Sequence, residues 1–136
     1  DGPVVIFDDD RFYMGSVLAE LVAGAGHKTV FVTPAAVVAP WSENTLEQDR
    51  IQRRLIELDV EILPLKQLGG MSNDTLTLDC VSSGRSTQIA CGTLVSVTSR
   101  LPNDSVWQSL HARIPSWRDH GFYRRRLRRL LSLPTG

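Results

Sequence analysis

The sequence predicts a three-layer α/β domain with a central parallel sheet and an antiparallel β-meander. Residues 3–7 form a short continuous apolar run of β-branched and aromatic side chains, which is typical of a strand buried on both faces, and residues 29–33 are again strand-like. Apolar residues recur between them at helical spacing over residues 14–25. Residues 75–81 and 87–91 alternate with period two around a glycine-containing turn, which predicts an antiparallel hairpin. The change from one pattern to the other indicates two different sheets.

The remaining elements follow the same logic along the chain. The strand, helix and strand of residues 3–33 form a βαβ unit, and such a unit is typical of a Rossmann-like domain. Thr45 and Gln48 form a capping-box pair that predicts the start of a second helix. We expect an irregular connection with two prolines at residues 34–41 and the second helix at residues 46–58. Two further strands are expected at residues 60–63 and 94–98, and a short helix at residues 105–110.

Charge divides the chain into two parts. The 136 residues carry 15 basic and 15 acidic side chains. Residues 113–136 hold seven arginines and one aspartate, which leaves residues 1–112 with 8 basic and 14 acidic side chains. We therefore expect a domain over residues 1–112 and an Arg-rich tail over residues 113–136. A basic tail is expected to fold onto the acidic body rather than to bind nucleic acid.

The sequence gives no sign of a membrane span, a secretory leader or a metal site. No apolar run approaches the roughly 18 residues of a membrane span, and no leader opens the chain, so we expect a cytoplasmic protein. Two cysteines are too few for a four-ligand site, and the three histidines lack ligand spacing. Three successive aspartates do not converge on one cation, because neighbouring side chains of a strand point to opposite faces.

Asp10, Gly15 and Thr33 occupy the positions at which a Rossmann-like domain recognises a dinucleotide. The G-x-G-x-x-G register reads Asp10-Arg-Phe-Tyr-Met-Gly15, so only the third glycine is present. Phe12 would obstruct the phosphates, and the carboxylates of residues 8–10 would repel them. Thr33 takes the place of the acidic residue that would bond the ribose hydroxyls, or of the arginine that would accept a 2′-phosphate. The pattern predicts a degenerate site that has lost NAD(P), with residues 8–10 capping the following helix instead.

Several segments together resemble the trimethylamine dehydrogenase family, the multidomain amine dehydrogenases related to old yellow enzyme, histamine dehydrogenase and 2,4-dienoyl-CoA reductase. The matching segments are residues 4–20, Gly26-His27, Val32-Thr33-Pro34, residues 41–48 and residues 50–55. The resemblance covers roughly residues 3–112. The aspartate-rich loop in place of the glycines is similar to the amine dehydrogenases rather than to the reductase.

The resemblance implies that this chain is a fragment, similar to the NADPH domain of glutathione-reductase-like proteins. The parent oxidoreductase would carry covalent FMN and a four-iron cluster in a barrel and pass electrons to an electron-transfer flavoprotein. This domain would then be structural, without catalytic residues or a cofactor of its own, and would pack with the barrel and an FAD-like domain. The alternative is a functional NAD(P)H-binding domain of a reductase-type flavin oxidoreductase. The Arg-rich tail does not follow the family pattern. A frameshift in the gene would produce such a departure.

Overall fold

The computed structural model of the protein describes residues 2–99 and 103–112. The chain divides into two compact units, Asp1–Ser99 and Arg100–Gly136. All strands of the described residues belong to the first unit, and the second contains one described helix, α3 (Ser105–His111). The Arg-rich tail expected at residues 113–136 lies outside the described residues, so its predicted packing stays a prediction.

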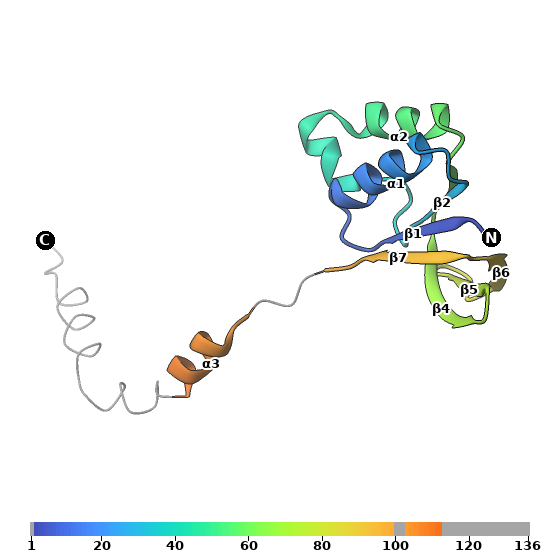
Figure 1. Ribbon diagram of the computed structural model, residues 1–136. Coiled ribbons are helices and arrows are strands. Elements are labelled where there is room, and N and C mark those ends of the chain that lie inside the picture. Colours follow the sequence, from blue (N-terminus) through green and yellow to red (C-terminus); the bar gives the residue numbers. More distant parts are fainter. Residues whose placement is uncertain (1, 100–102, 113–136) are drawn as a thin grey trace, which may run out of the picture. The chain divides into compact units, whose positions relative to one another are not determined.

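The first unit has three layers, which confirms the predicted fold class (Figure 1). Four parallel strands form the central sheet in the order β3-β2-β1-β7, and α1 and α2 lie on one of its faces. The antiparallel β4-β5-β6 sheet lies on the other face. The strands are β1 (Val4–Asp8), β2 (Thr29–Val32), β3 (Glu61–Leu63), β4 (Lys66–Ser72), β5 (Thr75–Cys80), β6 (Ser86–Ala90) and β7 (Thr93–Val97), and the helices are α1 (Met14–Gly24), η1 (Pro40–Thr45, a 3₁₀ helix) and α2 (Gln48–Glu57).

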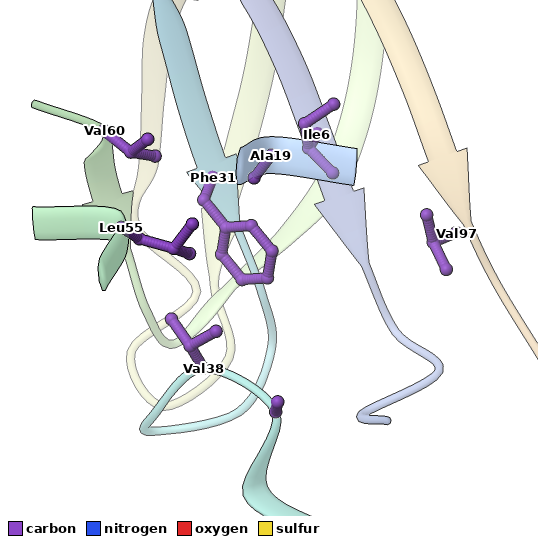
Figure 2. Packing of buried hydrophobic residues seen from close by; sticks show 8 residues of the cluster. Ile6, Ala19, Phe31, Val38, Leu55, Val60 and Val97 are labelled. Atoms are coloured by element: carbon purple, nitrogen blue, oxygen red, sulfur yellow. The ribbon is translucent and has the colours of Figure 1, made fainter. Parts of the chain in front are cut away.

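Alternate side chains of the central strands build two separate cores. Ile6 of β1 and Phe31 of β2 belong to the cluster on the helix side of the sheet, with Ala19 and Leu55 from the two helices (Figure 2). Their neighbours along the strands, Val5, Phe7, Val30 and Val32, belong to the cluster on the meander side, together with Leu76 and Leu78 of β5 and with Cys91. Because both faces of the strands are covered, residues 4–7 and 30–32 are apolar at every position.

Two details of the sequence interpretation differ from the structure. The predicted capping box is wrong, because α2 begins after Glu47 without a side-chain cap, and Gln48 donates to the carbonyl of Val38. Strand β4 was not expected as an element, because its Gly69-Gly70 pair and exposed side chains do not resemble a strand. It pairs with β5 through a register shift between Leu68 and Gly70, where the glycines allow the backbone to bulge.

Candidate functional site

The loop between β1 and α1 lies where a doubly wound α/β domain binds its ligand. In such sheets ligands bind beyond the carboxyl ends of the strands. Phe7 pairs with Val32 in parallel register, so Asp8 and Thr33 leave the sheet at the same edge. The structure therefore brings Asp10 of the loop and Gly15 in the first turn of α1 to the same edge as Thr33.

The carboxylate of Asp8 organises this loop from within. Its Oδ1 accepts the backbone amides of Asp10 at 3.0 Å and of Arg11 at 3.2 Å. Asp8 is only 1% exposed, and its Oδ2 has no hydrogen-bond partner in the described part of the chain. Burial raises the pKa of Asp8 above its usual value, although the two amides oppose that shift. Asp8 therefore supplies an internal acceptor to amides that a phosphate-binding loop offers to its ligand.

Gly15 is required by the same carboxylate. A Cβ added at Gly15 would lie 2.6 Å from Cγ of Asp8 and 2.8 Å from its Oδ2. The expected role of this glycine is close packing of helix on strand. Here a carboxyl group fills the space between them. The predicted capping role of the aspartates is also different in detail, because Asp8 caps loop amides and α1 begins after Tyr13 without a side-chain cap.

Phe12 lies against the 3₁₀ helix η1. Its ring stacks on Trp41 with centroids 5.7 Å apart and planes inclined by 4°. The amide of Trp41 also donates to the carbonyl of Arg11, which has a left-handed φ of 67°. Stacked aromatic pairs contribute about 0.5–1.5 kcal/mol beyond their area. The loop is thus attached to a segment that is thirty residues away in the sequence, and no local pattern predicted Trp41 as its partner.

Tyr13 makes the second attachment between the loop and the region of η1. Its hydroxyl lies 2.8 Å from Oγ1 of Thr45 and 3.0 Å from Oε2 of Glu47. The hydroxyl of Tyr13 is the main reason why the pKa of Glu47 is lowered, and Thr45 and Arg50 act in the same direction. Glu47 also pairs with Arg50 at 2.8 Å. The Glu47–Arg50 pair is visible in the sequence at i,i+3 spacing, but the part of Tyr13 is not, because Tyr13 lies more than thirty residues from Thr45 and Glu47.

Thr33 is buried at the end of β2. It is 1% exposed, and its Oγ1 accepts the amide of Ala35 at 3.2 Å. The Thr33 carbonyl accepts the amide of Lys66, so backbone and side chain are both engaged in the turn that leaves the sheet. A ribose-binding acid at this position would project to the ligand. The observed threonine instead closes a local turn.

A small cavity lies between the N-terminal parts of α1 and α2. Its volume is about 180 Å³, and it is lined by Tyr13, Ser16, Val17, Glu20, Glu47, Arg50, Ile51 and Leu55. Clefts that bury a drug-sized ligand have volumes of about 300–1,000 Å³. The cavity is therefore too small to enclose a dinucleotide.

The cysteines and the acidic residues of the described ranges do not form a metal centre. Cys80 and Cys91 are free thiols, and Cys91 is buried in the meander-side core. The hydroxyl of Ser83 and neighbouring amides lower the pKa of Cys80 to about 7. No group of three or more His, Cys, Asp or Glu residues that could hold a metal ion occurs among residues 2–99 and 103–112. In the same ranges, no helix has the length and apolar character to cross a membrane.

The raised pKa of Asp8 predicts a pH-dependent stability. Between the ordinary carboxyl pKa and the raised value, the folded chain binds more protons than the unfolded chain. The contribution of Asp8 to the free energy of unfolding therefore falls as the pH rises through that interval and becomes constant above the raised pKa, whereas the lowered pKa of Glu47 contributes with the opposite sign. Asp8→Asn keeps the Oδ1 acceptor without the charge. We expect it to remove this slope and to stabilise the chain at pH 7, as measured by urea unfolding from pH 4 to 7.

Asp49→Asn is the control for this measurement, because its side chain is 92% exposed and its partner Arg53 is also at the surface. It should leave the pH slope unchanged, since exposed ion pairs contribute little. An Asp8→Asn chain with the wild-type pH dependence would show that the buried Asp8 carboxyl does not titrate abnormally.

Fold and loop together define a dinucleotide-fold domain whose ligand loop is filled by its own side chains. Residues 2–96 match the model of the OYE-like second alpha/beta domain family, and the chain belongs to that family. A search of curated proteins gives no match to this chain.

The solved structures of two amine-oxidising enzymes are similar to this chain, as the sequence resemblance predicted. Histamine dehydrogenase from Rhizobium sp. 4-9 is 38% identical, with a TM-score of 0.73 over 88% of this chain and 18% of its own. The 6-hydroxypseudooxynicotine amine oxidase of Pseudomonas geniculata N1 is 30% identical, with a TM-score of 0.72 over 82% of this chain and 17% of its own. This chain thus spans less than a fifth of either relative.

A more distant structure shares the fold alone. Thioredoxin reductase from T. acidophilum is 9% identical, with a TM-score of 0.62 over 76% of this chain and 33% of its own. The similarity to a flavoprotein reductase confirms the expected architecture of a central parallel sheet with an antiparallel meander.

Proposed function

We propose that this chain is a structural domain of a cytoplasmic, amine-dehydrogenase-like oxidoreductase, and that it has lost NAD(P) binding. The hydrogen bonds from the amides of Asp10 and Arg11 to the Asp8 carboxylate carry this proposal. A phosphate that approached these amides would have to displace a buried carboxylate and would meet the further charges of Asp9 and Asp10. Like charges about 4 Å apart repel by roughly 4 kcal/mol at an effective dielectric near 20.

The redox chemistry belongs to other parts of the parent in this proposal. FMN and a four-iron cluster would lie in a barrel domain, and the electrons would leave through an electron-transfer flavoprotein. The names of the two amine-oxidising relatives support this assignment, together with the small share of their length that this chain spans. The described residues of this chain do not fit the four-iron cluster, since they contain two separate thiols and no group of metal ligands.

Calorimetric titration of the 136-residue chain with NADH, NADPH and ADP tests the loss of binding. We expect no dissociation constant below about 1 mM for any of the three, because the loop amides and the space beside Gly15 are occupied. A functional NADPH-binding domain of the same fold serves as the positive control. Micromolar binding that weakens in an Asp10→Ala variant would contradict the proposal and would support the reductase-type alternative.

A further inference from the structure

The outer face of α1 is apolar, whereas the outer face of α2 is charged. Among the eleven residues of α1, Glu20 is the single charged residue, and it pairs with Arg54 of α2 at 2.8 Å. The ten residues of α2 include five charged ones: Asp49, Arg50, Arg53, Arg54 and Glu57. A helix that faces water normally carries such charges, and a helix that is apolar all round is normally buried. The two helices lie on the same face of one sheet, so each serves as a comparison for the other.

Three side chains form the exposed apolar stripe of α1. Met14, Val17 and Leu21 follow one another at helical spacing and are 44%, 56% and 67% exposed. The opposite side of the helix is already used, because Gly15, Ser16 and Ala19 are buried against the sheet. The exposed apolar side chains of the stripe therefore do not contribute to the core of this domain.

The stacked rings of Phe12 and Trp41 extend this apolar surface at the N-terminal end of α1. Phe12 is 47% exposed and Trp41 is 56% exposed. Hydrogen bonds of Arg11 and Tyr13 to the region of η1 hold the loop in place. We call Phe12, Met14, Val17, Leu21 and Trp41 together the α1 ridge. Exposed apolar patches of this kind mark interaction sites.

The composition of the α1 ridge favours a permanent neighbour over a transient one. Obligate interfaces resemble the interior of a domain, whereas transient interfaces carry more polar and charged groups. The single charged side chain of α1 is already paired within the domain. The two amine-oxidising relatives contain more than four fifths of their length outside the segment that matches this chain. A further domain of the same polypeptide is therefore the occupant that these observations favour.

We infer that the α1 ridge is the docking surface for another domain of a longer parent polypeptide, which covers it with an apolar surface of its own. This inference rests on the proposed function only in requiring a multidomain parent. It is independent of the loss of NAD(P) binding. The nucleotide titration can therefore contradict the loss of binding while the labelling experiment below still supports the docking surface, and the reverse also holds.

Cysteine labelling at Leu21 tests the inference. Leu21→Cys is placed in a Cys80→Ser background and labelled with iodoacetamide, both in the 136-residue chain and in the complete reading frame that contains it. Mass spectrometry of the peptide that holds residue 21 gives the rate. We expect rapid labelling in the 136-residue chain and at least tenfold slower labelling in the complete protein, because the second domain covers the ridge. Val17→Cys provides a second probe if the first variant fails to fold.

Arg53→Cys is the matched control, because its side chain in α2 is as exposed as Leu21 but lies on the charged face. It should be labelled at the same rate in both proteins. Equal rates at residue 21 would overturn the inference, as would protection of both positions, which would show general shielding. A reading frame that encodes no further domain would also overturn it.

Sedimentation of the 136-residue chain completes the experiment. A monomer agrees with the inference. A dimer that Leu21→Arg dissociates would assign the ridge to a second copy instead.

Discussion

Gly15→Ala is expected to lower the free energy of unfolding by about 2 kcal/mol, although alanine normally stabilises a helix relative to glycine by roughly 0.5–1 kcal/mol. The new Cβ would lie 2.6 Å from Cγ of Asp8, closer than real carbon atoms approach. Asp8 cannot easily retreat, because it is 1% exposed and its Oδ1 holds two amides. Urea unfolding at pH 7 measures the change.

Gly24→Ala is the matched control at the other end of the same helix. A Cβ added there would meet nothing within 4 Å. This variant should therefore show the ordinary gain of about 0.5–1 kcal/mol. The two substitutions are chemically identical, so opposite signs would isolate the contact with Asp8. A stabilised Gly15→Ala chain would mean that the carboxyl group does not fill the space beneath α1.

The fold could be predicted because each central strand needs apolar residues on both faces. Ile6 and Phe31 face the helices while Val5 and Val30 face the meander, so the sequence shows continuous apolar runs. Strand β4 could not be predicted in the same way. Its backbone bulges beside Gly69, where a Cβ would collide with the carboxylate of Asp79. That requirement depends on a partner strand and leaves no local period in the sequence.

The sequence predicts where a degenerate dinucleotide site would lie but not the contacts made there. The missing glycines between Asp10 and Gly15 indicate an altered phosphate loop, and Thr33 takes the place of the ribose-binding residue. The stacking of Phe12 on Trp41, however, depends on the path of the chain through Ala39, which has a left-handed φ of 45° before η1. Such a path is set by tertiary packing rather than by local propensity. The sequence therefore predicts that Phe12 obstructs the phosphate site, but it does not predict that Trp41 is the stacking partner of Phe12.

Phe31→Ala should have the largest effect on stability, a loss of about 3–5 kcal/mol. Phe31 is fully buried at the centre of the helix-side core, between Ile6, Leu55 and Val38 (Figure 2). Its truncation removes a large apolar side chain from a layer that two helices and the sheet enclose, so the surrounding structure can relax only partly. Small domains are stable by roughly 5–15 kcal/mol, and the loss is therefore a large share of the total.

Phe12→Ala removes the same ring as Phe31→Ala, but at the surface. Comparing the two variants separates the effect of burial from the effect of losing a ring. Phe12 is 47% exposed and stacks on Trp41, so we expect a cost of about 1 kcal/mol. Urea unfolding of both variants at pH 7 compares the two sites directly. Equal losses would contradict the layered arrangement, because they would mean that the ring of Phe12 is packed as fully as that of Phe31. Phe12 belongs to neither core, so the loop can be altered at this position at little cost to the fold, which allows the role of the loop to be examined in a folded chain.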